Sequence, residues 1–267
     1  MKRRLRTLAL VCALAVTGCG GPGTTAYPTQ AVPSGVTVTT SEDASAAAGP
    51  FEGTAAEKYP QGAAGITLPA AKAVKGFTAK EVTAALKKVR AAMIAARLEK
   101  AMLVEHRSAT LLDLLAPTNR RDVATWFSDD GLMNIATWIS PKAQLDPAHP
   151  PRVSGRITYA SRMVDGFQTL QVTTNFIWVY AFVRPDKPIA AVHDEIVWEF
   201  TDPADVQPAD RGMWIAEADS YSSMMDCAES DKGLLAPGVP ELVEPTSSTN
   251  IEDTLKADHS LDIGNDC

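Results

Sequence analysis

The chain has 267 residues, of which 45% are hydrophobic and 21% charged, a composition typical of a water-soluble protein with one or at most two domains. The formal net charge is −7 at pH 7. This acidity argues against binding of nucleic acid or of an anionic lipid surface through the body of the protein.

Residues 1–18 have the three parts of an export signal. The basic segment 1-MKRRLR-6 precedes an apolar run at 8–16, and the small residues Thr17 and Gly18 follow. The apolar run is shorter than the roughly 20 residues that span a bilayer. The pair Arg3-Arg4 is compatible with twin-arginine export, but Arg6 and Thr7 stand where that signal has apolar residues. We therefore expect general secretion.

The signal ends in 16-VTGC-19, which resembles the lipobox of bacterial lipoproteins. The commonest family residue at the first position is Leu, and Val is a tolerated variant. The resemblance implies cleavage between Gly18 and Cys19 and attachment of a diacylglyceryl group to the Cys19 thiol. Two acyl chains, such as palmitate, hold a protein stably on a membrane, whereas one chain is marginal. We expect a lipid-anchored protein on the extracytoplasmic face; the alternative is an ordinary secreted protein with a free Cys19.

Cysteine usage agrees with export. Cys12 leaves with the signal and Cys19 is lipidated, so Cys227 and Cys267 remain. Two remaining thiols in an exported protein most simply form a disulfide. Closing this loop of about 40 residues is worth roughly 4 kcal/mol in the chain-entropy model. The alternative is a metal site, but no histidine lies at ligand spacing, so we expect neither a metal nor a cofactor.

Residues 19–75 are rich in Gly, Ala, Pro, Ser and Thr, and aromatic residues are sparse. Such a segment cannot bury enough apolar surface to fold by itself. We interpret it as a disordered tether, of which the stretch 66–74 can dock onto the body. The folded domain is expected at 76–227, followed by an acidic tail at 228–267 that the disulfide holds.

The domain begins with helices. Thr78 and Glu81 form a capping box, and apolar residues at helical spacing continue the first helix to about Leu103. A second helix at 109–116 stops at Pro117, and Asn119 can cap a third one that ends at Trp126. The segment 132–140 is ambiguous between strand and helix.

From residue 153 onward the apolar period changes to two, which predicts strands. Asp165-Gly166 is a two-residue type I′ turn signal, and it sets a register in which Val164 opposes Phe167. This register divides the first two strands into two faces. The apolar face has Val153, Ile157, Tyr159, Met163, Leu170, Val172, Phe176 and Trp178, and the other has Arg156, Thr158, Arg162, Thr169, Thr173 and Asn175.

Two further strands complete the sheet. In the third, Val192, Ile196, Trp198 and Phe200 join the apolar face, and His193, Glu195 and Glu199 point outward. The fourth is 213-MWIAEADSY-221. Helices followed by an antiparallel meander of at least four strands predict a two-layer α+β domain.

This order of elements, over about Phe77 to Cys227, resembles the cone-shaped fold of the nuclear transport factor 2 and ketosteroid isomerase superfamily. The resemblance is one of topology, and no motif carries it. It implies helices that cover a curved sheet and leave a pocket. The superfamily contains both enzymes and binding modules without catalytic activity, so the fold does not decide the function.

Asp194 is the one carboxylate on the apolar face, where we expect it opposite Trp178. Desolvation among aromatic side chains would raise its pKa into the range useful for general acid or base chemistry. Such a residue could be the proton carrier of an isomerase or lyase. The structural alternative is that Asp194 lies at the sheet edge or pairs with Arg90 or Arg97 of the first helix.

The other candidates are weaker. Glu217 and Asp219 form a second acidic pair, but we expect Trp214, Ala216 and Ala218 to be buried, which leaves both acids in solvent. His193 and Glu195 share a face and could begin a metal site, yet they lack a third ligand. His106 is interpreted as a cap or surface residue.

No GxSxG, P-loop, HExxH or CxxC motif occurs in the chain. The sequence therefore favours a non-catalytic module that binds a partner protein or an apolar ligand in a cone-shaped pocket. The alternative is an exported isomerase or lyase that works through Asp194.

Overall fold

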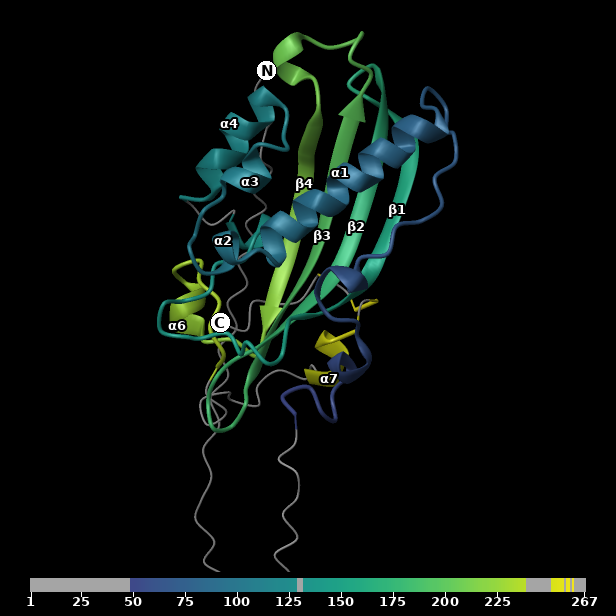
Figure 1. Cartoon of the computed structure of the whole chain (residues 1–267). Helices are drawn as coiled ribbons and strands as arrows, with labels where there is room; N and C mark the ends of the chain where they lie inside the picture. The colour runs from purple at the N-terminus through teal and green to yellow at the C-terminus, as the bar shows by residue number, and fades with distance from the viewer. Residues whose placement is uncertain (1–48, 129–131, 239–250, 257, 260, 262–267) are drawn as a thin grey trace, which may run out of the picture. The chain divides into compact units, whose positions relative to one another are not determined.

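Figure 1 shows the computed structural model of the chain, which describes residues 49–128, 132–238, 251–256, 258, 259 and 261. All of them belong to one unit of the chain, which spans residues 45–267. The predicted signal, its cleavage site and Cys19 lie outside the described residues, as does Cys267.

The described chain is an α+β structure in which helices precede a single sheet. The helices are α1 (Ala79–Arg97), α2 (Lys100–Leu103), α3 (Ala109–Leu112), α4 (Pro117–Trp126), α5 (Leu132–Ile135), α6 (Cys227–Ser230) and α7 (Ile251–Thr254). The strands are β1 (Arg152–Val164), β2 (Phe167–Ala181), β3 (Ile189–Thr201) and β4 (Met213–Ser223). They form an open antiparallel sheet in the order β1-β2-β3-β4. The predicted helices-then-meander architecture is confirmed.

The β1–β2 hairpin has the predicted register. Val164 pairs with Phe167 across a two-residue turn. Asp165 (φ 51°) and Gly166 (φ 89°) both have positive φ, as a type I′ turn requires. Because the register holds along both strands, Arg156 and Asn175 share one face of the sheet and Val153 and Trp178 share the other.

Helix α1 lies obliquely across one face of the sheet and buries it (Figure 1). Its N-terminus has the predicted capping box: Glu81 N donates to Thr78 Oγ1 (3.3 Å), and Thr78 N donates to the Glu81 carboxylate (2.7 Å). The helix ends at Arg97, before the predicted end near Leu103. The largest buried side chains under and around it include Leu86, Phe176, Trp178, Tyr180 and Trp198.

Helix α4 begins differently from the prediction. Pro117 is its first residue and Ala116 its N-cap, which suits proline because the first helical N–H has no partner. Asn119 is therefore inside the helix and does not cap it. Its buried amide accepts from Ile215 N (2.9 Å) and donates to Ile215 O (3.3 Å). Asn119 thus occupies the place of a neighbouring strand at the free edge of β4.

A bulge in β4 corrects one predicted face. Val197 pairs with Glu217 and Trp198 pairs with Ile215, so Ala216 is an extra residue between them. The alternation along β4 shifts at this point. Trp214 consequently lies on the same face as Glu217 and Asp219, whereas we predicted it on the opposite face.

The second face of the sheet is partly covered by segments from both ends of the domain. Phe51, Ala56 and Leu255 are buried against Ile177 and Val179. The first segment contains two short 3-10 helices, Ala55–Lys58 and Gly62–Gly65. Folded structure therefore begins by residue 49, before the predicted boundary at 76, and continues into the predicted tail. The folded part is longer than predicted because these flanking segments bury apolar side chains on the second face of the sheet.

Candidate functional site

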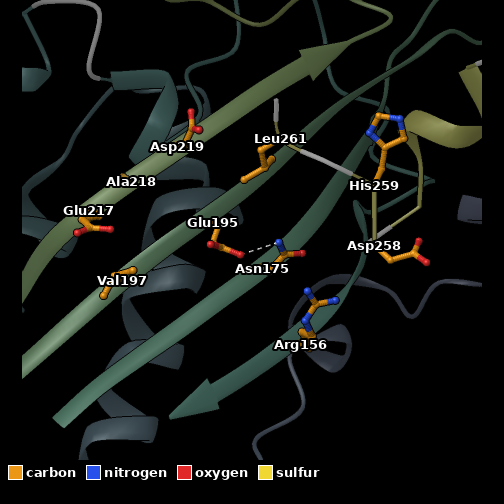
Figure 2. Close-up of a pocket in the computed structure, with 10 residues that line it drawn as sticks. All are labelled: Arg156, Asn175, Glu195, Val197, Glu217, Ala218, Asp219, Asp258, His259 and Leu261. Carbon is orange, nitrogen blue, oxygen red and sulfur yellow. Dashed lines mark hydrogen bonds between the residues drawn. The ribbon is translucent and has the colours of Figure 1, made fainter. Parts of the chain in front are cut away.

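A polar pocket of about 540 Å³ lies on the second face of the sheet, the face opposite to α1 (Figure 2). Its floor is one transverse row of paired residues, one from each strand. Arg156 of β1 pairs with Asn175 of β2, Asn175 with Glu195 of β3, and Glu195 with Asp219 of β4. Side chains of cross-strand pairs lie on the same face, so all four line the pocket.

Two further groups complete the walls. Glu217 extends the β4 side of the pocket next to Asp219 (Figure 2). Asp258, His259 and Leu261 line it from the segment that follows α7. The lining thus carries four carboxylates and a single guanidinium.

A buried hydrogen-bonded chain supports the centre of the pocket. His193 is 1% exposed, and its Nε2 lies 3.0 Å from Asn175 Oδ1. Asn175 Nδ2 in turn donates to Glu195 Oε2 (3.0 Å). Since the Asn175 carbonyl accepts, the facing His193 nitrogen is the donor. Burial, aided by the charges of His259 and Arg156, lowers the pKa of His193 to about 4.

The location of His193 corrects the prediction that it faces solvent. His193 lies on the predicted face of β3, but it is buried, and Leu255 packs on this face of the sheet. Tyr221 packs edge-on against His193 and donates its hydroxyl to Thr254 O (2.8 Å). Tyr221 thereby connects the sheet to α7. Glu195, two residues farther along β3, remains half-buried at the pocket.

Three charged pocket residues on the strands are exposed: Arg156, Glu217 and Asp219. None of the three has an ion-pair or hydrogen-bond partner among the residues that the structure describes. The prediction that Glu217 and Asp219 are solvated is confirmed, and the structure adds that both face the same cavity as Arg156.

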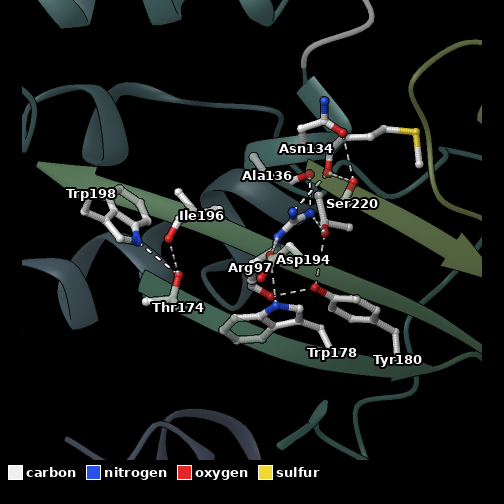
Figure 3. Close-up of polar contacts among 12 residues, drawn as sticks. Arg97, Asn134, Ala136, Thr174, Trp178, Tyr180, Asp194, Ile196, Trp198 and Ser220 are labelled. Atoms are coloured by element: carbon white, nitrogen blue, oxygen red, sulfur yellow. Dashed lines mark hydrogen bonds and ion pairs between the residues drawn. The ribbon is translucent and has the colours of Figure 1, made fainter. Parts of the chain in front are cut away.

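Asp194 lies on the other face, inside the core (Figure 3). Its Oδ2 accepts from Arg97 Nε (2.9 Å) and from Trp178 Nε1 (3.0 Å). We predicted that Asp194 lies opposite Trp178, but its cross-strand partner is Phe176. The contact between Asp194 and the Trp178 indole is therefore diagonal. Pairing with a helix arginine, the structural alternative, is confirmed for Arg97.

The remaining donors of Arg97 are also used. Its Nη1 donates to Ala136 O (2.5 Å) and Thr137 Oγ1 (2.9 Å), and its Nη2 donates to Met133 O (2.9 Å). Burial raises the pKa of Asp194 to about 6, against the opposing effects of Arg97 and Trp178. Asp194 does not line the polar pocket. This cluster supports the core, in which Arg97 and Asp194 are each 1% exposed.

The other predicted candidates have structural contacts. Arg90 donates to the carbonyl oxygens of Ile66 (3.2 Å) and Ala63 (2.7 Å), which fastens the segment before α1. His106 stacks on Trp138 with ring centroids 4.7 Å apart. Within the described ranges, no group of three or more His, Cys, Asp or Glu residues could hold a metal ion. His193 and Glu195 are joined through Asn175 instead.

The cysteine predictions fall largely outside the described residues. Cys227 is the first residue of α6, while Cys19 and Cys267 are not described. The lipid attachment and the disulfide both remain predictions. Among the described residues, no helix is both long enough and apolar enough to cross a membrane.

Sequence reasoning missed the pocket, although the hairpin register already placed Arg156 and Asn175 side by side on the polar face. Extending that register through β3 would have added Glu195. The contribution of Asp258, His259 and Leu261 to the pocket had no sequence signal.

Comparisons with protein-family models, with curated proteins and with solved structures gave no match.

Proposed function

We propose that this chain is a lipid-anchored protein of the bacterial extracytoplasmic membrane face whose α+β domain binds a ligand without catalysis. The observation that carries the binding role is the 540 Å³ pocket whose floor is built by residues from all four strands. Pockets with convergent polar groups are the usual form of small-molecule sites.

The anchor is supported by the sequence 16-VTGC-19 behind a short apolar run. The diacylglyceryl group at Cys19 would supply the two acyl chains that stable membrane attachment needs. A disulfide between Cys227 and Cys267 would suit the oxidising compartment in which such a protein works.

The pocket's position favours a polar ligand over the apolar one expected in a cone. The aromatic side chains that would line the cone, such as Phe176, Trp178 and Trp198, are buried beneath α1 as core. Asp194 is tied to Arg97 within that core. These contacts remove the support for an isomerase or lyase. Membership of the nuclear transport factor 2 and ketosteroid isomerase superfamily stays a proposal, consistent with helices that precede an antiparallel meander.

The anchor is tested by growth of bacteria that express the full chain with labelled palmitate. The wild-type chain should incorporate the label, and the Cys19→Ala variant should not. Cys12→Ala is the matched control, because Cys12 leaves with the signal, and it should label like wild type. Label retained in Cys19→Ala would overturn the anchor.

The pocket is tested by native mass spectrometry of the purified full chain after incubation with a small-molecule extract of the same bacteria. Wild type should retain a small molecule that Glu195→Arg does not, because the substitution reverses a charge at the pocket floor. Glu199→Arg is the control, since Glu199 lies on the same face of β3 outside the pocket. Identical retention by wild type and Glu195→Arg, or no retention at all, would contradict the binding role.

A further inference from the structure

We infer that the pocket accepts a zwitterion with a cationic side chain, such as a basic amino acid, with its carboxylate at Arg156 and its cation at Glu195 and Asp219. This inference rests on the proposed binding function and specifies the chemical class of its ligand.

The charges along the pocket floor follow a definite order. The row runs from the Arg156 guanidinium through the neutral Asn175 amide to the carboxylates of Glu195 and Asp219. Adjacent strands are about 4.8 Å apart, so the outer two strands are separated by about 14 Å. Figure 2 shows the guanidinium on one side of the row and the carboxylates of Glu217 and Asp219 on the other. A ligand that lies along this row meets a positive group at one end and negative groups at the other.

Three of these charged side chains are not paired by contacts among the described residues. Arg156, Glu217 and Asp219 have no ion-pair partner in the part of the chain that the structure describes. The strand spacing prevents Arg156 from reaching Asp219 directly. A guanidinium binds a carboxylate through two parallel hydrogen bonds, and such charge-assisted bonds are about twice as strong as neutral ones. Both ends of the row can therefore gain bonds from a ligand without breaking any.

The middle of the row is fixed before a ligand binds. Buried His193 donates to Asn175 Oδ1, which turns Asn175 Nδ2 toward Glu195. Glu195 is thereby held in one orientation at the centre of the floor. A site whose groups are already oriented loses less conformational entropy on binding.

The pocket lining as a whole is acidic. Four carboxylates face one guanidinium, so the pocket attracts cations and repels simple anions. A cation without a carboxylate would leave Arg156 unused. A neutral amino acid would leave the acidic end unused. The combination of both ends selects a basic amino acid.

The experiment is isothermal titration of the purified full chain with three matched probes at low ionic strength. L-arginine has both charges, agmatine lacks the carboxylate, and L-citrulline replaces the guanidinium by a neutral group of similar shape. We expect L-arginine to bind about tenfold or more tightly than either of the other two, because each of these lacks the charge-assisted bonds at one end of the row.

Variants assign the two ends. Arg156→Gln should abolish the preference for L-arginine over agmatine and keep the preference over L-citrulline. Glu195→Gln should do the reverse, since its amide oxygen can still accept from Asn175. Arg162→Gln is the matched control, as Arg162 lies on the same face of β1 outside the pocket, and it should bind like wild type.

Equal affinity of wild type for the three probes, or no binding of L-arginine, would overturn the zwitterion inference. If a molecule from the extract is nevertheless lost in Glu195→Arg, the binding function stands and only the ligand class is wrong. If no such molecule exists either, both proposals fail.

Discussion

Arg97 and Asp194 are separated by 97 residues, yet Arg97 Nε and Asp194 Oδ2 lie 2.9 Å apart with side chains only 1% and 2% exposed. The pair joins the last turn of α1 to the middle of β3. Arg97 also binds the carbonyl groups of Met133 and Ala136, so one guanidinium aligns the helix, the sheet and the segment around α5. Removal of one member would leave the other charge buried without compensation.

We therefore expect Asp194→Asn to lower the free energy of unfolding by about 3–5 kcal/mol, as for other broken buried ion pairs. The double variant Arg97→Met/Asp194→Leu should recover part of this loss. Urea unfolding followed by circular dichroism measures both. Glu105→Gln, which breaks the exposed pair with Arg107, is the control and should cost less than about 1 kcal/mol. If Asp194→Asn is as stable as wild type, the Arg97–Asp194 ion pair does not contribute to the stability of the fold.

Gly155 is required by the close packing of β1 on β2. A Cβ at this position would lie 2.2 Å from Asn175 O and 2.5 Å from the ring carbon Cγ of Phe176. Neither the strand backbone nor a core ring can move freely, so Gly155→Ala should destabilise the domain by about 1–3 kcal/mol. Thermal unfolding measures the effect. Gly49→Ala, whose Cβ would meet nothing within 4 Å, should unfold like wild type.

His193 should make stability depend on pH. Its pKa is about 4 in the folded protein, below the ordinary value of 6.5, so between these values the unfolded chain binds more protons. The stabilising effect of neutral His193 is complete above pH 6.5 and is lost as the pH falls from 6.5 to 4. His193→Gln should flatten this part of the pH profile. Urea midpoints at pH 4.5, 5.5 and 7 measure it, and an unchanged slope would assign the effect to other groups.

Glu229 should give a second pH effect at more acidic values. It accepts from Lys142 Nζ (2.6 Å), Lys232 Nζ (2.7 Å) and Ser140 Oγ (2.6 Å), and these bonds lower its pKa to about 2 from 4.5. Its contribution is complete above pH 4.5 and is lost as the pH falls toward 2. Glu229→Gln should therefore lower the melting temperature at pH 7 and have little effect at pH 2. An equal effect at both pH values would disprove the ionic contribution.

The predicted disulfide between Cys227 and Cys267 can be tested by counting free thiols. Alkylation of the denatured mature protein without reductant should label neither Cys227 nor Cys267, and reduction should expose both. If the bond forms, Cys267→Ser should also lower the melting temperature, because the unfolded chain would lose a loop constraint. Two labelled thiols before reduction would show that the bond is absent.

Local patterns in the sequence determined the order and type of the main elements. The capping box at Thr78 and Glu81 placed the start of α1, because a cap involves neighbouring residues only. The turn at Asp165-Gly166 fixed the β1–β2 register for the same reason. Alternation along β1, β2 and β3 then separated the core face from the polar face.

Tertiary structure alone decided how exposed each polar residue is and which residues share a site. His193 faces away from the main core as predicted, but it is buried, because Tyr221 packs against it and is itself bonded to Thr254 of α7. The bulge at Ala216 places Trp214 on the same face as Glu217, and no pattern in the neighbouring sequence predicted this bulge. Arg97, rather than Arg90, met Asp194 because the angle of α1 across the sheet is set by packing of its whole buried face. Local hydrogen bonds and turn conformations depend on adjacent residues. Burial and charge pairing depend on segments that are distant in sequence and that only the folded chain brings together.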